Sequence, residues 1–280
     1  MTLNEGEETF RLGVVNYINT APLLVPLREK GPIQGWEIVE DTPAALNSML
    51  RAGKIHVGLI SSYAYGQDYQ DYFVLKGYCI SATGTVGSVV LYSKVPIYEL
   101  SSKTICLTNQ SATSVNLLYI ILEYFNGLAP KYVTGTFKDF KAARNDMAAY
   151  LAIGDEALKI NRAYPDYYAY DLASIWYETT SLPFVFALWA VRRDSGLIGT
   201  KYLENLKQRL ELAYHEGARR LDEISAMVAG RIPMPQVDCL SYLKGIEFDL
   251  SRLKLKGLAH FFKLLHQMGR LSALPEIVEV

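Results

Sequence analysis

Neutral polar residues gather where predicted strands give way to helices. Nearly all of them are hydroxyls, amides or glycines, and the set comprises Asn19, Thr20, Ser61, Ser62, Thr83, Gly84, Ser88, Asn109, Ser111, Thr113, Ser114, Gly154 and the carboxylate Asp155. Helix N-termini carry unpaired N–H groups and about half a positive charge, so hydroxyls at such termini can receive carboxylates or other anions. The same residue types also cap helices and form turns. The pattern therefore fits either an anion-binding cleft or local capping.

Histidines, cysteines and glycines lack the spacing that metal sites, disulfide frameworks and nucleotide-binding loops need. The four histidines, His56, His215, His260 and His266, include no H-E-x-x-H pair, and the three cysteines, Cys79, Cys106 and Cys239, are far apart in the chain. We therefore expect no metal site and no disulfide framework, but buried thiols. The sequence also has no G-x-S-x-G, G-x-x-x-x-G-K-[ST] or G-x-G-x-x-G motif, so a nucleotide cofactor is not expected.

The elements that position the polar residues alternate between strand and helix. Residues 11–18, 36–41 and 55–60 read as strands. The helix after the first strand is expected to begin with Thr20 as its cap and Pro22 in its first turn, and the next with Thr42 and Pro43. This β-α-β-α-β order predicts a mainly parallel sheet covered by helices.

A second α/β unit follows, and amphipathic helices complete the chain. Residues 78–93 predict two strands around a turn, 102–108, 148–154 and 184–192 further strands, and 114–125 a helix. Residues 204–230, 237–246 and 251–271 have the apolar spacing of helices. Crossings near residues 92–97 and 183–190 predict an α/β fold of two lobes, with residues 1–93 and 188–280 in lobe one and 94–187 in lobe two.

Two facing lobes would enclose a cleft. Ligands of open α/β sheets bind beyond the carboxyl ends of the strands, which is where the neutral polar residues lie. Trp176 and Trp189 flank the second crossing, and we expect Trp176 to line the cleft.

Composition narrows the class of protein. The 280 residues include 28 Lys and Arg against 29 Asp and Glu, and half of the chain is hydrophobic, as in globular proteins. The near-zero net charge argues against a nucleic-acid partner, which would require a surplus of basic residues. The first residues are acidic and polar, and no segment reaches the ~18 apolar residues of a membrane span, so we expect a cytoplasmic protein without a membrane partner.

Several strings occur in the order typical of one family. They are VNYINTAPL, VGLISSYAY, GTVGSVVLYSKVPI, SATSVNLL, AIGDEAL and WYETTSLPFVFALW. Over residues 11–195 the chain resembles the chorismate dehydratases of the futalosine-type menaquinone pathway. The resemblance implies a two-lobed fold like that of type 2 periplasmic binding proteins, with two interlobe crossings, and a hydro-lyase that uses no cofactor.

The resemblance also implies roles for particular residues. The V-x-Y-x-N-x-x-P-L segment falls on 15–23, G-x-V-x-S-V on 84–89, S-x-T-S on 111–114 and G-D on 154–155. The implied catalytic residues are Asn19, Ser88 and Asp155, and the implied substrate-binding residues are Ser61, Ser62, Gly84, Ser111, Thr113, Ser114, Gly154 and Trp176. Asn16 and Thr85 stand where other residues are common in the family. These two departures affect the expected rigidity of their loops, and thus substrate positioning more than the class of reaction.

The implied reaction eliminates water from chorismate to give 3-[(1-carboxyvinyl)oxy]benzoate. Either Asp155 or the substrate's own enolpyruvyl carboxylate could remove the ring proton, and Asp155 could instead cap its helix. Two alternatives remain open: 1,4-dihydroxy-6-naphthoate synthase of the same pathway, and a non-catalytic protein that binds a small anion. A monomer and a homodimer are equally compatible with the sequence.

Overall fold

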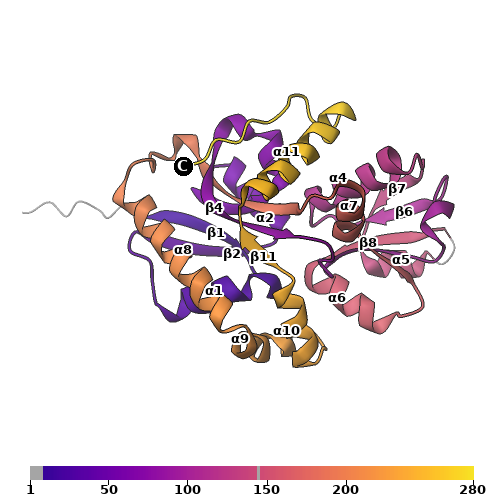
Figure 1. Ribbon diagram of the computed structural model, residues 1–280, viewed down its shortest axis with the longest axis horizontal. Coiled ribbons are helices and arrows are strands. Elements are labelled where there is room, and N and C mark those ends of the chain that lie inside the picture. Colours follow the sequence, from indigo (N-terminus) through magenta and orange to yellow (C-terminus); the bar gives the residue numbers. More distant parts are fainter. Residues whose placement is uncertain (1–8, 144–145) are drawn as a thin grey trace, which may run out of the picture.

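The fold consists of two lobes, each built on one sheet, which lie side by side in Figure 1. The computed structural model describes residues 9–143 and 146–280. The first sheet has the order β11 (Glu247–Asp249), β4 (Tyr72–Ala82), β10 (Phe184–Arg192), β3 (Val57–Ser61), β1 (Phe10–Val15) and β2 (Trp36–Asp41). The second has the order β7 (Lys131–Thr134), β6 (Thr104–Leu107), β8 (Ala149–Ile153), β5 (Val89–Ser93) and β9 (Tyr168–Asp171).

The first lobe has the predicted parallel core. β1 pairs in parallel with β2 and β3, and α1 (Ala21–Glu29), α2 (Pro43–Arg51) and α3 (Ser62–Gln67) follow the three strands in turn. Thr42 caps α2 as expected, with its hydroxyl accepting from the Ala45 N–H at 3.4 Å. Thr20 occupies the cap position of α1 but does not cap it, because its hydroxyl donates backwards to the Val15 and Tyr17 carbonyls at 2.5 and 2.8 Å.

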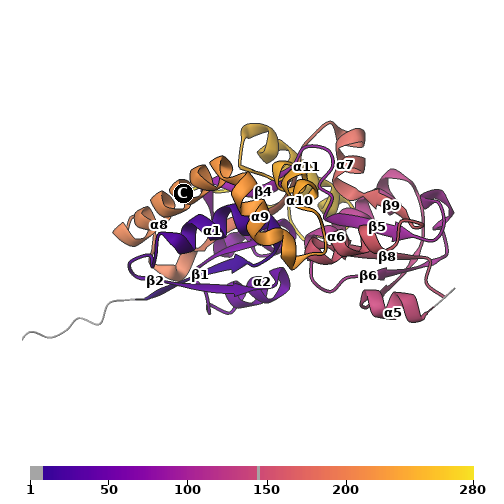
Figure 2. The same ribbon diagram turned by 90° about the horizontal axis from the view of Figure 1, so that it is seen from below.

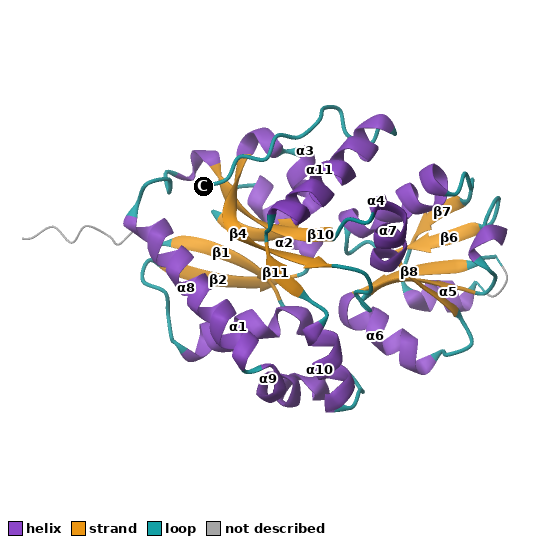
Figure 3. Ribbon diagram, in the orientation of Figure 1, coloured by secondary structure: helices purple, strands orange, loops and turns teal. Residues whose placement is uncertain are grey.

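The second lobe is a mixed sheet with helices on both faces (Figure 3). β8 pairs in parallel with β6 and antiparallel with β5. Its helices are α4 (Ala112–Tyr119), which continues as a π-helix over Ile120–Phe125, α5 (Phe137–Ala142), α6 (Gly154–Ala163) and α7 (Leu172–Thr180). The helix predicted over residues 114–125 is thus confirmed, with its second half wound more loosely.

The first crossing lies earlier than predicted, and the second overlaps the start of the predicted segment. β4 and β5 were read as two strands around a turn, but β4 pairs with β10 and β11 whereas β5 pairs with β8 and β9 of the other sheet. Residues 83–88 are therefore the first crossing and residues 181–183 the second. We propose lobe boundaries in these two segments in place of residues 93 and 188.

The C-terminal helices pack on the first lobe and reach the second. They are α8 (Lys201–Arg219), α9 (Leu221–Val228), α10 (Gln236–Lys244) and α11 (Arg252–Gln267). α8 packs along α1, and a Cβ on Gly217 would lie 1.7 Å from the Pro22 carbonyl oxygen, so only glycine allows this approach. α9 and α10 lie between α1 and α6 in Figure 2, and Leu158 of α6 shares a small apolar core with Ile224 and Leu243.

The described residues include no helix with both the length and the apolar character of a membrane span. The three cysteines are buried and unpaired, as expected. Burial raises the pKa of the Cys79 thiol to about 12, which suits a packing role.

Candidate functional site

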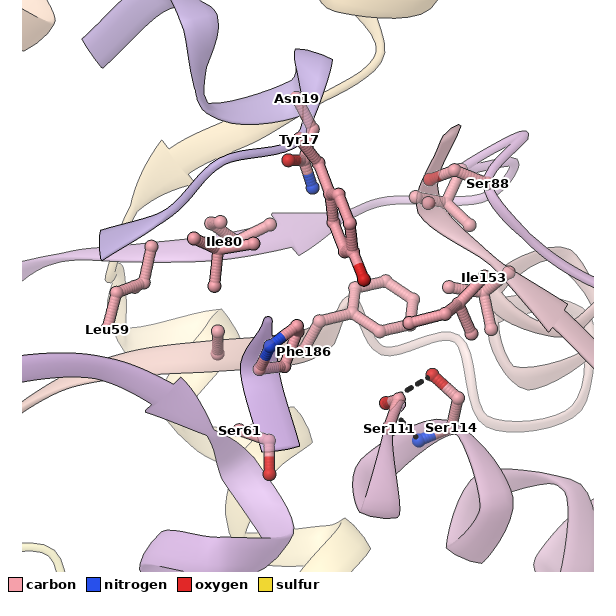
Figure 4. A pocket seen from close by; sticks show the side chains of 16 residues that line it. Tyr17, Asn19, Leu59, Ser61, Ile80, Ser88, Ser111, Ser114, Ile153 and Phe186 are labelled. Carbon is pink, nitrogen blue, oxygen red and sulfur yellow. Dashed lines mark hydrogen bonds between the residues drawn. The ribbon is translucent and has the colours of Figure 1, made fainter. Parts of the chain in front are cut away.

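A pocket lies between the lobes, at the carboxyl ends of strands from both sheets (Figure 4). It holds about 590 Å³ of atom-free space, including the part open to solvent. Lobe one contributes Val15, Tyr17, Asn19, Pro43, Leu59, Ser61, Ile80, Phe186 and Ala187. The first crossing and lobe two contribute Val86, Ser88, Val89, Ser111, Ser114, Ile153 and Gly154.

The lining is apolar with a few neutral polar groups. None of the described residues that line the pocket carries a charge. Branched and aromatic side chains, such as Leu59, Ile80 and Phe186, offer surfaces for a flat ring. An anion bound here would therefore be held by hydroxyls, amides and backbone N–H groups, as the sequence suggested.

Two of the lining serines also cap helices. The Ser61 hydroxyl accepts from the Ala64 N–H at 3.3 Å and from the Asn47 amide at 3.1 Å. The Ser111 hydroxyl accepts from the Ser114 N–H at 3.1 Å and lies 2.9 Å from the Ser114 hydroxyl. The capping and ligand-binding interpretations of these residues are thus compatible, because the capped end of α4 faces the pocket with its partial positive charge.

Tyr17 is a pocket residue that the sequence interpretation missed. Its ring points into the pocket in Figure 4, and its hydroxyl donates to the Gln110 side-chain oxygen at 2.8 Å, across the cleft. Burial raises the pKa of Tyr17 to about 12, so it remains a hydrogen-bond donor at neutral pH. The available signal was its place in the string that also supplies Asn19.

Gly154 is required for the position of Tyr17. Its φ is +57°, a left-handed conformation that favours glycine, and a Cβ there would lie 2.9 Å from the Tyr17 ring. Substrate binding by Gly154 stays a prediction, and what the structure shows is that Gly154 makes room for an aromatic side chain.

Asn19 enters the pocket from lobe one and Ser88 from the first crossing. The side-chain oxygen of Asn19 is buried and has no hydrogen-bond partner among the described residues. The backbone carbonyl of Ser88 accepts from the Gly154 N–H at 2.7 Å, and Ser88 lines the pocket.

Tyr242 of α10 adds a further polar group near Ser88. Its hydroxyl is also buried without a hydrogen-bond partner in the described structure, and its ring lies near Gly87. Burial raises the pKa of Tyr242. Nothing in the amphipathic pattern of α10 distinguishes this tyrosine from a core residue.

Asp155 is not among the residues that line the pocket, and its predicted catalytic role stays a prediction. One carboxylate oxygen accepts from the Ile18 N–H at 3.0 Å, and the other lies 3.8 Å from the Arg231 guanidinium. Burial raises the pKa of Asp155, and these two groups oppose the shift. It does not cap α6 either, because Ile153 holds that position. The carboxylate instead joins the start of α6 to the loop that carries Asn19.

Four further predicted site residues lie outside the pocket lining. The Ser62 hydroxyl donates to the Val185 carbonyl at 2.6 Å, and the Thr113 hydroxyl accepts from the Tyr63 N–H at 2.8 Å. Gly84 belongs to the first crossing, with φ of +85°. Trp176 is buried in an aromatic cluster with Phe125, Phe184, His260 and Phe261, because its large ring packs α7 against β10 and α11.

Comparison with known proteins finds sequences similar to this chain over most of its length. A family model described as menaquinone biosynthesis matches residues 10–267. The chain is 31% identical over 269 residues to a chorismate dehydratase from Thermus thermophilus, which covers 89% of this chain and 93% of that protein.

Solved structures share the fold at lower identity. The protein AF1704 from Archaeoglobus fulgidus has a TM-score of 0.76 at 19% identity, covering 95% of this chain and 99% of that one. The periplasmic aliphatic sulphonate-binding protein SsuA from Escherichia coli has a TM-score of 0.68 at 15% identity, covering 96% and 90%. The chain thus has the predicted periplasmic-binding-protein-like fold.

Proposed function

The chain belongs to the menaquinone biosynthesis family, and from that premise we propose that it is a chorismate dehydratase. This hydro-lyase would eliminate water from chorismate to give 3-[(1-carboxyvinyl)oxy]benzoate. The observation that carries the proposal is the interlobe pocket, whose described lining is uncharged and includes the unpartnered oxygen of Asn19. We further propose that the reaction needs no cofactor and takes place in the cytoplasm, in a monomer or a homodimer.

Neutral groups are sufficient to bind a dianion. Micromolar affinity corresponds to about 8 kcal/mol, and hydrogen bonds to a charged group contribute roughly 1.5–3 kcal/mol each. Four or five such bonds would therefore suffice before the cost of ordering. Ser111 and Ser114 supply hydroxyls at the start of α4, and the Ser61 hydroxyl, which accepts two bonds, still has its own proton to donate.

The same lining suits a reaction in which the substrate supplies the base. The enolpyruvyl carboxylate would remove the C3 proton, and the C4 hydroxyl would leave with that proton as water, so that the ring becomes aromatic. A cation beside the carboxylate would weaken it as a base, and the described lining places none there. Asp155 lies outside the lining and already accepts a hydrogen bond, which supports the substrate carboxylate as the base.

Asn19 and Ser88 would orient the substrate. The unpartnered oxygen of Asn19 can accept a hydrogen bond from the ring hydroxyl, and Ser88 can donate to the enolpyruvyl arm. Alignment of the carboxylate with the C3 proton is the principal requirement, because a well-placed intramolecular base can replace a protein side chain.

Contacts between the lobes support reaction in a closed cleft. Tyr17 bonds to Gln110, and the Tyr63 N–H bonds to Thr113. With the Asp155 contact, these bonds hold the lobes together around the pocket. Closure excludes water and restricts the substrate to the reactive pose.

The test is incubation of the purified protein with chorismate, followed by mass spectrometry. The proposal predicts an aromatic product lighter by one water, and a lower but measurable rate in Ser88→Ala with an unchanged fold. Stabilisation by chorismate in a thermal shift assay without turnover would favour a non-catalytic anion-binding protein. If the protein neither binds chorismate nor turns it over, the proposal is refuted. The next activity to assay would then be that of 1,4-dihydroxy-6-naphthoate synthase.

A further inference from the structure

We infer that Asp171 is a positioning residue that fixes the loop carrying Ser88, an inference that rests on the proposed function. Asp171 ends β9 and precedes α7. It lies outside the pocket lining and was not among the residues predicted from the sequence. Its carboxylate nevertheless connects two segments that are more than eighty residues apart in the chain.

One part of the carboxylate caps a helix. Its Oδ1 atom accepts from the N–H groups of Ala173 and Ser174, both at 3.0 Å. These are the N–H groups of the first turn of α7, which would otherwise lack a partner. Had Asp171 made only these bonds, it would be an ordinary cap.

The other oxygen reaches the first crossing. Oδ2 accepts from the Gly87 N–H at 2.6 Å and from the Val86 N–H at 3.1 Å, and the Val86 N–H also lies 3.3 Å from Oδ1, so the bond to Gly87 is the one that Oδ2 makes alone. These are the two residues immediately before Ser88. A second link runs alongside, because the Thr85 and Ser174 hydroxyls lie 2.7 Å apart.

Ser88 is thus held from two sides. Residues 83–88 contain no strand or helix, and Gly84 and Gly87 adopt φ of +85° and +73°, so the path of the loop depends on specific bonds. The carboxylate of Asp171 fixes the residues before Ser88, and the Gly154 N–H fixes its carbonyl at 2.7 Å. Moving either anchor would shift the Ser88 hydroxyl relative to a bound ring.

Asp171→Asn separates the two roles. Asparagine caps helices as well as aspartate does, so its carbonyl oxygen can retain the bonds to α7. Its NH₂ group would then face the Gly87 N–H, and a donor cannot accept that bond. The substitution should therefore release the loop and preserve the helix.

The experiment measures chorismate turnover and hydrogen–deuterium exchange in the same variant. We expect faster exchange of the peptide covering residues 83–88, and kcat lower by roughly 10- to 100-fold with KM changed by less than about threefold, because displacements near 1 Å cost about that much. In a Ser88→Ala background, Asp171→Asn should reduce kcat by less than about twofold further, because the group it positions is gone. A purely structural defect would reduce both backgrounds equally.

Asp139→Asn is the matched control. Asp139 accepts from the Thr136 N–H at 2.8 Å in the capping box of α5, away from the pocket, and its substitution should leave kcat unchanged. Unchanged exchange of the loop peptide in Asp171→Asn, an unchanged kcat, or an equal loss in both backgrounds would each overturn the inference. An inactive wild type would instead overturn the proposed function and, with it, the catalytic part of this inference.

Discussion

Gly154→Ala tests whether the contact with Tyr17 shapes the pocket. The substitution has two separable costs. A non-glycine residue in the left-handed region costs roughly 1–2 kcal/mol, and the φ of +57° places Gly154 there. The new Cβ would also lie 2.9 Å from the Tyr17 ring, so the ring must move or the site must absorb an overpacking cost of about 1–3 kcal/mol.

The sum gives the expected magnitude. The free energy of unfolding should fall by roughly 2–5 kcal/mol if the ring stays in place. If the ring moves, the protein loses instead the bond from Tyr17 to Gln110, a net contribution of about 0.5–1.5 kcal/mol, and the pocket changes shape. In either case chorismate binding should weaken, because Tyr17 lines the pocket.

Gly127→Ala provides the control. Gly127 has a similar φ of +63°, but a Cβ there would meet nothing within 4 Å. Its substitution should therefore cost only the backbone strain, about 1–2 kcal/mol, and leave chorismate binding unchanged. Denaturant unfolding and calorimetric titration of both variants measure the difference. Equal loss of stability and equal binding in the two variants would refute the reasoning.

The further predictions concern Tyr242, Asp155 and Gly217. Tyr242→Phe removes a buried hydroxyl that has no partner in the described structure, so the melting temperature should stay the same or rise; a clear fall would show that the hydroxyl makes a stabilising bond. Asp155→Asn should retain kcat within a few-fold of the wild type in a single-turnover assay, since Asp155 lies outside the pocket lining, and a loss beyond 100-fold would restore it as the base. Because burial raises the pKa of Asp155, the folded wild type binds a proton more tightly than the unfolded chain does. The stability of the wild type relative to Asp155→Asn should therefore rise as the pH falls from above the raised pKa towards the ordinary pKa of aspartate. Urea unfolding of both proteins across this pH range measures the difference, and a constant difference would contradict the prediction. Gly217→Ala should lower stability by about 3 kcal/mol or more, because α1 and α8 must separate to admit a Cβ 1.7 Å from the Pro22 carbonyl oxygen, and a circular dichroism melt like that of the wild type would contradict it.

Apolar runs and helix caps in the sequence correctly predicted several strands and helices. β2 and β10 occupy the predicted residues, and α2 follows its predicted Thr42 cap. The pairing of β5 was missed because strand partners are chosen across the whole chain, and a turn between two apolar runs does not reveal that they diverge. The pattern over residues 204–230 was read as one helix, whereas Arg220, bonded to Glu29 and Glu223, separates α8 from α9.

For the candidate site, too, the local sequence predicted some features and not others. The sequence placed polar residues at strand ends, and Asn19, Ser61, Ser88, Ser111 and Ser114 do line one pocket, although their roles stay proposals.

Side-chain direction was not predictable. Ser62 and Thr113 are next to pocket residues yet turn to backbone partners, and Phe186 enters the pocket from a strand that was read only as core. Adjacent residues face opposite ways on a strand and point in clearly different directions on a helix, and only the assembled fold decides which of them faces a ligand.

The position of β10 has a consequence for synthesis on the ribosome. β10 lies between β3 and β4 in the first sheet, yet the chain reaches it only after the second sheet is complete at Asp171. A nascent chain that has emerged as far as residue 183 therefore exposes unpaired edges on β3 and β4, while its second sheet can already close. The residues of β10 must emerge from the ribosome before the central strand of the first sheet can pair with β3 and β4.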